Sequence, residues 1–152
     1  MKAAFFGGVG QPLRIGQMSD PTPADDQVIL RIAACGICGS DLHITTDPAT
    51  FGIQAGTVLG HEFAGKIVAR GADVTSLRIG DNVAVSPIFG CGLCPRCMAG
   101  DPAWCAQMRL IGGGYAEYVA VTARQCRGLA PLACWARSGH GGWGPRGSRW
   151  LI

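Results

Sequence analysis

The chain of 152 residues has few charged side chains and no long apolar run. Only 15% of its residues are Asp, Glu, Lys or Arg. No uninterrupted apolar stretch approaches the roughly 18 residues that a membrane-spanning helix needs, so we expect no membrane association. The N-terminus lacks an A-x-A-like cleavage site, which argues against a signal peptide and makes the cytoplasm the expected compartment.

Acidic residues are missing from the end of the chain. Residues 118–152 carry five Arg and no Asp, Glu or Lys, together with Trp135, Trp143 and Trp150. The absence of Lys and the admixture of Trp and Gly argue against nucleic-acid binding. We expect residues 1–125 to form one domain and residues 126–152 to be a non-matching tail, left by a truncation or frame shift. The alternative is a genuine short protein with its own C-terminus.

Glycine and proline are abundant, with 24 and 9 residues, and favour short strands joined by turns. Apolar positions alternate from Val28 to Ile32, as in a strand, and further strands are expected near the N-terminus, at 61–70, at 82–86 and at 115–121. One helical turn is expected at 40–44, with Ser40 as its N-cap and Asp41 at the positive end of its dipole. The sequence therefore predicts a mainly β domain.

Four cysteines fall within the stretch CGLCPRCMAGDPAWC, at Cys91, Cys94, Cys97 and Cys105. Disulfides are disfavoured in a chain without an export signal. An iron–sulfur cluster is the main competitor, but the bacterial pattern with this opening places its fourth Cys after three residues. Four unrelated buried thiols are disfavoured by the spacing. We predict a structural zinc site, which has no open position for a substrate.

A second group of candidate ligands combines CGICGSDLH at 35–43 with GHE at 60–62. Catalytic zinc takes three protein ligands and keeps one position open. Cys38 and His61 would meet if the strands beside them are neighbours, which gives two of the three ligands. Taken singly, a Cys is usually a small core residue and a His is usually hydrogen-bonded in place.

Polar residues adjoin this pair. Ser40 and His43 are three residues apart, so on a helical turn they face one side, where a hydroxyl can pass a proton to an imidazole. Asp41 and Glu62 are expected to orient the imidazole or to tune the metal. The alternative is that Ser40 and Asp41 only cap a helix.

The three motifs G-I-C-G-S-D-L-H, G-H-E and C-x2-C-x2-C-x7-C, in this order, resemble the zinc-dependent alcohol dehydrogenase family of the medium-chain dehydrogenases/reductases. The resemblance covers residues 1 to about 125 and is strongest to the polyol and threonine dehydrogenase branches. It implies a GroES-like β-barrel with short helices and a structural-zinc loop. In the family, a Rossmann domain that binds NAD or NADP follows this N-terminal catalytic domain.

The resemblance also implies roles for single residues. Cys38 and His61 would bind the catalytic zinc, Glu62 would be the acidic neighbour that approaches it, and Ser40 and His43 would relay the substrate proton. The structural zinc would be held by Cys91, Cys94, Cys97 and Cys105. The implied reaction is hydride transfer from a zinc-bound alcohol or polyol to NAD or NADP, in an enzyme that is usually a homo-oligomer.

The sequence departs from the family pattern in two ways. No acid follows Glu117, so that only Cys126, Cys134 and His140 could replace the family's third catalytic ligand. The glycines of GHGGWG (139–144) match G-x-G-x-x-G, but no strand precedes them and no helix or acid follows, so we expect no Rossmann domain. The alternative function is therefore a non-catalytic, zinc-stabilised β-barrel module that lacks redox activity.

Overall fold

The computed structural model describes residues 1–129 of the chain. The candidate ligands Cys134 and His140, the three tail tryptophans and the GHGGWG glycines lie outside the described residues. Within the described part, no helix combines the length and the apolar character that crossing a membrane requires.

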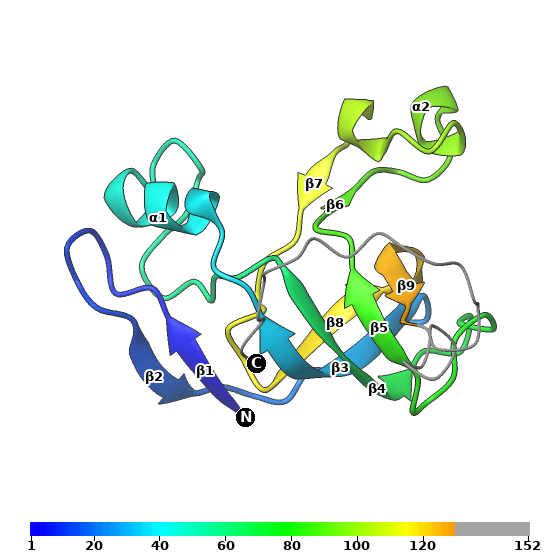
Figure 1. The fold of residues 1–152 in the computed structure, drawn as a ribbon, viewed down its shortest axis with the longest axis horizontal. Helices are drawn as coiled ribbons and strands as arrows, with labels where there is room; N and C mark the ends of the chain where they lie inside the picture. The colour runs from blue at the N-terminus through cyan, green and yellow to red at the C-terminus, as the bar shows by residue number, and fades with distance from the viewer. Residues whose placement is uncertain (130–152) are drawn as a thin grey trace, which may run out of the picture.

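Short strands joined by loops make up most of the described chain (Figure 1). The strands are β1 (Lys2–Phe5), β2 (Arg14–Gln17), β3 (Gln27–Cys35), β4 (Phe63–Arg70), β5 (Asn82–Val85), β6 (Ile88–Phe89), β7 (Arg109–Leu110), β8 (Tyr118–Thr122) and β9 (Cys126–Gly128). The helices are α1 (Gly39–Thr46) and α2 (Pro95–Met98), with 3₁₀ turns η1 (Pro102–Trp104) and η2 (Ala123–Gln125). The predicted mainly β fold is confirmed.

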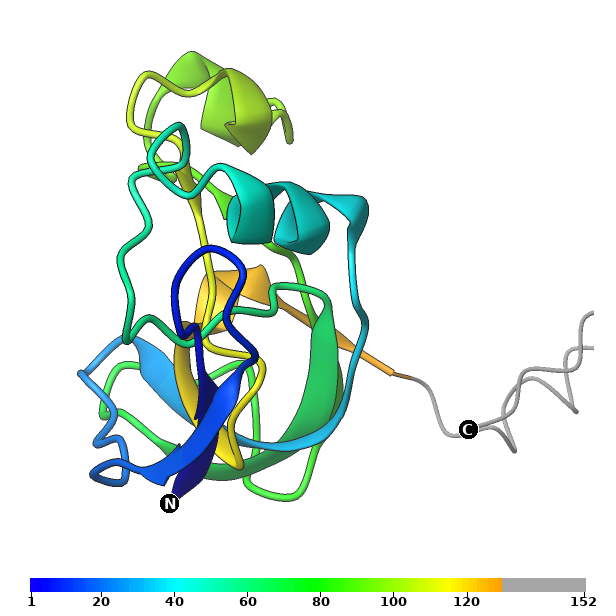
Figure 2. The same cartoon turned by 90° about the vertical axis from the view of Figure 1, so that its left-hand side faces the viewer.

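An antiparallel sheet of order β8-β3-β4-β5-β9 forms the body of the molecule. The register between β3 and β4 shifts between Ile29 and Leu30 and again between Ile32 and Ala34. Such bulges bend a strand and increase its twist. The sheet accordingly curves around its core, as the two views show (Figures 1 and 2). Two small sheets, β1-β2 and β6-β7, complete the fold.

Buried aliphatic side chains hold the sheet together. Val28 and Leu30 of β3, both fully buried, pack with residues of five other segments: Phe63, Ile67, Val74, Val83, Val85, Val121 and Cys126. Burial of each such side chain stabilises the fold by about 1.5–3 kcal/mol. A second, smaller cluster of Phe6, Ile44 and Leu59 lies under α1. Ile44 of α1 belongs to this second cluster, which anchors the helix to the segments of Phe6 and Leu59.

Two predicted strands begin later than expected. The strand predicted from residue 115 begins at Tyr118, because the segment before it pairs with β1: the Ala4 amide donates to the Tyr115 carbonyl at 2.8 Å. The strand predicted from His61 begins at Phe63, so that His61 and the residue after it lie in the loop that enters β4. In both cases the residues left outside the strand belong to the candidate site described below.

The last strand lies at the edge of the sheet. β9 pairs with β5, with Cys126 opposite Val85, so three residues beyond the predicted domain end at residue 125 lie in the sheet. Cys126 is buried in the main core. The division of the chain into residues 1–125 and 126–152 stays a prediction.

Both helices lie at one end of the barrel, in each of the two views (Figures 1 and 2). α1 follows β3, and α2 belongs to the segment between β6 and β7 that we call the cysteine loop, residues 91–105. The cysteine loop projects from the body of the molecule. Within the cysteine loop, α2 forms one turn of helix and η1 follows it as a 3₁₀ turn.

Candidate metal centres

The cysteine loop brings four sulfur atoms together. The Sγ atoms of Cys91, Cys94, Cys97 and Cys105 all lie within 4.8 Å of one another. Four sulfurs at about 2.3 Å from a zinc ion, arranged as a tetrahedron, are ~3.8 Å apart. The arrangement therefore fits a closed four-thiolate zinc site and leaves no place for a fifth, reacting group.

Backbone amides stabilise two of these sulfurs as thiolates. The amides of Leu93 and Cys94 donate to Cys91 Sγ at 3.5 and 3.3 Å and lower the pKa of that thiol to about 6. The amides of Cys91 and Gln107 likewise donate to Cys105 Sγ at 3.4 and 3.3 Å and lower the pKa of that thiol. Cysteines bind metal as thiolates, so these backbone hydrogen bonds favour the binding of a cation by the loop.

The pKa of the Cys97 thiol is shifted in the opposite direction. The Gly92 amide lowers the pKa of the Cys97 thiol, but loss of hydration and the three neighbouring cysteine sulfurs raise it by more, so that the net shift is upward. Negative charge on four adjacent sulfurs is repulsive unless a cation neutralises it. The chemistry of the donor set thus also fits a divalent metal.

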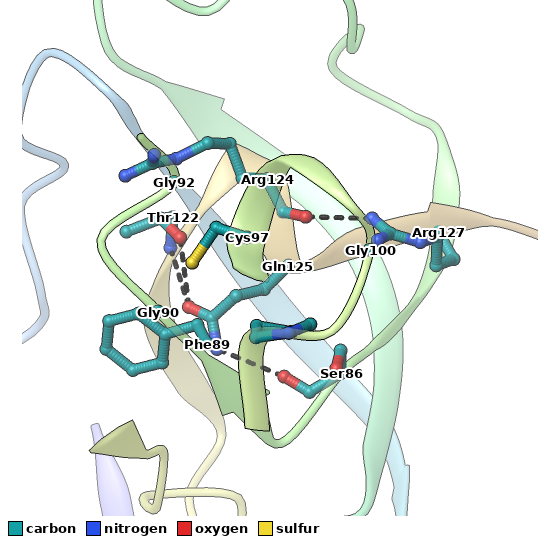
Figure 3. Close-up of a pocket in the computed structure, with 11 residues that line it drawn as sticks. Ser86, Phe89, Gly90, Gly92, Cys97, Gly100, Thr122, Arg124, Gln125 and Arg127 are labelled. Atoms are coloured by element: carbon teal, nitrogen blue, oxygen red, sulfur yellow. Dashed lines mark hydrogen bonds between the residues drawn. The ribbon is translucent and has the colours of Figure 1, made fainter. Parts of the chain in front are cut away.

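The cysteine loop is attached to the sheet by residues after β8. Arg124 donates to the main-chain oxygen of Cys91 at 3.2 Å. The buried Gln125 accepts from Thr122 Oγ1 at 3.0 Å and donates to the Ser86 carbonyl at 3.0 Å. These residues line a cavity of about 350 Å³ between the loop and the sheet (Figure 3). The sequence analysis did not identify Arg124 or Gln125, since neither lies in a recognisable motif.

The ends of β3 and β4 bring together a second group of possible ligands. Cys35, the last residue of β3, pairs with Phe63, the first residue of β4. Cys38 follows the first strand, and His61 and Glu62 precede the second. One ligand atom from each of these three residues lies within 4.8 Å of the other two. Sulfur, nitrogen and carboxylate oxygen in this number are a donor set that suits a catalytic zinc.

A carboxylate near in sequence lies beside Cys38 and His61. Sequence analysis left Cys126 as one of the few replacements for the missing third ligand. The structure buries Cys126 in the main core and instead places Glu62 beside Cys38 and His61. Glu62 is exposed, so its carboxylate can move towards or away from a metal.

His61 is buried between two polar neighbours. Its Nδ1 lies 3.5 Å from Asp41 Oδ1, and its Nε2 lies 3.2 Å from Ser40 Oγ. Asp41 Oδ1 is buried and has no hydrogen-bond partner among the described residues. An imidazole with its proton on Nδ1 turns a donor towards this oxygen and leaves Nε2 unprotonated, able to accept from Ser40 Oγ. That tautomer is the one required when Nε2 binds a metal.

The start of α1 differs from the prediction. Ser40 was expected to be the N-cap, which is wrong: the N-cap is Cys38, and its amide donates to the Asp41 carboxylate at 2.9 Å. Asp41 therefore caps the helix, as an acid in the first turn does well. The Ser40 hydroxyl turns to His61 instead. No hydrogen bond joins Ser40 to the exposed His43 within residues 1–129, so their proton relay stays a prediction.

One polar residue of the site was missed by the sequence analysis, which took Tyr115 as a strand residue only. Its hydroxyl donates to Asp41 Oδ2 at 3.1 Å. No local signal in the sequence marked it, because the contact joins residues 74 positions apart. Cys35, to which no role was assigned, ends β3, and burial raises the pKa of its thiol.

Comparison with known proteins identifies the family. The model of the alcohol dehydrogenase GroES-like domain matches residues 24–131. The chain therefore belongs to this family, whose members include zinc-dependent alcohol and threonine dehydrogenases, as the resemblance predicted.

Individual relatives agree. The chain is 38% identical over 130 residues to a probable zinc-binding alcohol dehydrogenase of Mycobacterium tuberculosis, which covers 81% of this chain and 33% of that protein. It is 36% identical over 132 residues to an NAD-dependent alcohol dehydrogenase of Saccharolobus solfataricus, covering 80% and 38%. The crystal structure of galactitol-1-phosphate dehydrogenase from Escherichia coli superposes with a TM-score of 0.76 at 35% identity, over 86% of this chain and 38% of that one. The chain thus spans between 33% and 38% of the length of these relatives.

Proposed function

We propose that this chain is the zinc-binding catalytic domain of an alcohol or polyol dehydrogenase that uses NAD or NADP. The observation that carries the proposal is the meeting of Cys38, His61 and Glu62 at the ends of two paired strands. Support comes from the relatives, which are named as zinc-binding, NAD-dependent and polyol-phosphate dehydrogenases.

In this proposal the two metal groups have different tasks. Cys91, Cys94, Cys97 and Cys105 hold a structural zinc, and Cys38, His61 and Glu62 hold the catalytic one. When bound, a catalytic zinc supplies a Lewis acid that makes an alcohol hydroxyl more acidic. Asp41 keeps the His61 imidazole in the tautomer that has its proton on Nδ1 and leaves Nε2 unprotonated.

The proton leaves through α1. The Ser40 hydroxyl, 3.2 Å from His61 Nε2, is both a donor and an acceptor, so it can take a proton from a substrate hydroxyl beside His61. His43 lies one turn further along the helix and is exposed, so its imidazole can release the proton to water. NAD or NADP, bound by the family's Rossmann domain, would supply the hydride acceptor. A cytoplasmic location and a homo-oligomeric state belong to the same proposal.

Metal content tests the proposal directly. We expect the reduced, purified chain to hold two metal ions after dialysis against cobalt, both with absorption from sulfur-to-cobalt charge transfer. Cys38→Ala and His61→Ala should each remove one ion and leave the other. Cys126→Ala is the matched control, since Cys126 is a buried cysteine outside both metal groups, and it should keep both ions. One ion in the unaltered chain, unaffected by Cys38→Ala, would support the non-catalytic zinc-stabilised module instead.

A further inference from the structure

The hydroxyl of Tyr115 has two acceptors within reach but only one proton to donate. Asp41 Oδ2 lies 3.1 Å away and the Gly36 carbonyl oxygen 3.3 Å away. The carboxylate is the nearer acceptor and carries charge, which makes it the stronger partner. Burial, and next the hydrogen bond to Asp41, raise the pKa of the Tyr115 phenol, so the hydroxyl remains protonated and able to donate.

Backbone hydrogen bonds to two other segments hold the tyrosine in place. The Tyr115 amide donates to the Leu59 carbonyl at 3.0 Å, and the Ala4 amide donates to the Tyr115 carbonyl at 2.8 Å. The ring packs against the cluster under α1 and lies directly over Gly60, where a Cβ atom would come within 2.7 Å of it. The backbone of Tyr115 is therefore held by segments outside α1.

Asp41 connects this hydroxyl to His61. The residue is 4% exposed, and Oδ2 accepts from both the Cys38 amide at 2.9 Å and the Tyr115 hydroxyl. Oδ1 has no hydrogen-bond partner among the described residues and faces His61 Nδ1 at 3.5 Å. Since both oxygens belong to one planar group, two donors on Oδ2 determine the direction of Oδ1. A single donor would leave the carboxylate free to turn about that one bond.

We propose that Tyr115 is a positioning residue of the Cys38–His61–Glu62 group: its hydroxyl fixes the Asp41 carboxylate so that Oδ1 faces His61 Nδ1 and Nε2 stays unprotonated. Its relevance to metal binding rests on the proposed function; its effect on the His61 tautomer does not. Tyr115→Phe removes the hydroxyl and keeps the ring that packs over Gly60.

The first arm of the test measures metal affinity. Cobalt is titrated into the reduced full chain in competition with a chromogenic chelator. Tyr115→Phe should weaken binding at the Cys38–His61–Glu62 group about tenfold, as loss of a hydrogen-bond partner behind a metal ligand does. Affinity at the four-cysteine site should stay the same in the same titration. Tyr118→Phe is the matched control, because Tyr118 is the chain's other tyrosine and its hydroxyl bonds to no described residue.

The second arm needs no metal. Nitrogen NMR of the metal-free chain distinguishes the two imidazole tautomers, and the chain has only three histidines, so the His61 signals can be assigned with His61→Ala. The unaltered chain and Tyr118→Phe should show the proton of His61 on Nδ1, and Tyr115→Phe should move part of the population to Nε2. The exposed His43 should not change and serves as the internal reference.

The two arms separate the two ideas. If the unaltered chain binds no second ion but Tyr115→Phe shifts the His61 tautomer, the proposed function fails and the positioning role stands. If Tyr115→Phe leaves the His61 tautomer as it is, the positioning role is overturned, whatever the metal content. If Tyr115→Phe shifts the tautomer but leaves the affinity for the second ion unchanged, Tyr115 has no positioning role in the metal site.

Discussion

The guanidinium of Arg124 donates to the main-chain oxygen of Cys91, 3.2 Å away, and so ties the turn after β8 to the cysteine loop. The contact has space only because residue 92 is glycine: a Cβ atom there would overlap Arg124 Nη1, and the backbone has a φ of +80°. Cys91 is therefore held in two ways. Arg124, after β8, bonds to its main-chain oxygen, and the amides of Leu93 and Cys94 bond to its sulfur.

Loss of this contact should weaken metal binding by the loop. We expect Arg124→Leu to reduce the zinc affinity of the four-cysteine site about fivefold, since one exposed hydrogen bond contributes about 1 kcal/mol. Arg127→Leu is the control, because within residues 1–129 the Arg127 guanidinium donates to the carbonyls of Arg124 and Cys126 and not to the cysteine loop. Zinc competition with a chelator measures both; equal affinities in the two variants would show that the contact does not support the loop.

Removing one ligand of the loop should have a much larger effect. Cys97→Ala should release the structural zinc and unfold the cysteine loop, because the stability of such a loop is largely metal-binding energy. Zinc content should fall by one ion per chain, and the loop amides should exchange with solvent. Unchanged zinc content and an unchanged melting temperature would contradict the assignment of Cys97 as a ligand.

A glycine under the tyrosine ring provides a second way to disturb Asp41. A Cβ at Gly60 would lie 2.7 Å from the Tyr115 ring and 2.9 Å from Cys35 Sγ, at a φ of +82°. Gly56 has a similar φ of +93° with nothing within 4 Å of a Cβ, so Gly56→Ala carries only the backbone strain of about 1–2 kcal/mol. We expect Gly60→Ala to be less stable than Gly56→Ala by a further 1–3 kcal/mol, about the cost of overpacking.

Urea denaturation measures the difference in stability between Gly60→Ala and Gly56→Ala. Cobalt binding at the Cys38–His61–Glu62 group should be weaker in Gly60→Ala and unchanged in Gly56→Ala. Two variants of equal stability and equal metal content would mean that the ring can move aside without consequence.

Alkaline pH should destabilise the fold through Cys126. Burial raises the pKa of its thiol to about 11, from an ordinary value of 9.0. The unfolded chain then releases this proton more readily than the folded one. The stabilisation of the folded state by the protonated thiol is therefore intact below pH 9 and is lost as the pH rises to about 11. A shift of this size corresponds to about 2–3 kcal/mol.

The comparison variant is Cys126→Ala, which has no thiol to titrate. The free energy of unfolding in urea, measured at intervals above pH 8, should fall more steeply for the unaltered chain than for Cys126→Ala. Parallel curves for the two proteins would contradict the effect of burial on this thiol.

The sequence by itself determined the chemistry that depends on local spacing. Cys91, Cys94, Cys97 and Cys105 lie within one short loop, and turns of two residues between ligands leave little freedom, so the four sulfurs were predictable as a group. The same is true of the strand through Val28 and of the helical turn after Cys38, where the pattern of apolar residues and a first-turn acid are local signals.

Only the tertiary structure decided the surroundings of His61. Pairing of β3 with β4 brings Cys38 to His61 across more than twenty residues of sequence, and the loop that leads to β8 returns with Tyr115. The same packing turned Ser40 away from capping α1 and towards His61, since Asp41 took the cap. Such contacts depend on which strands are neighbours, and strand order is fixed by burial of the whole core, which no short stretch of sequence encodes.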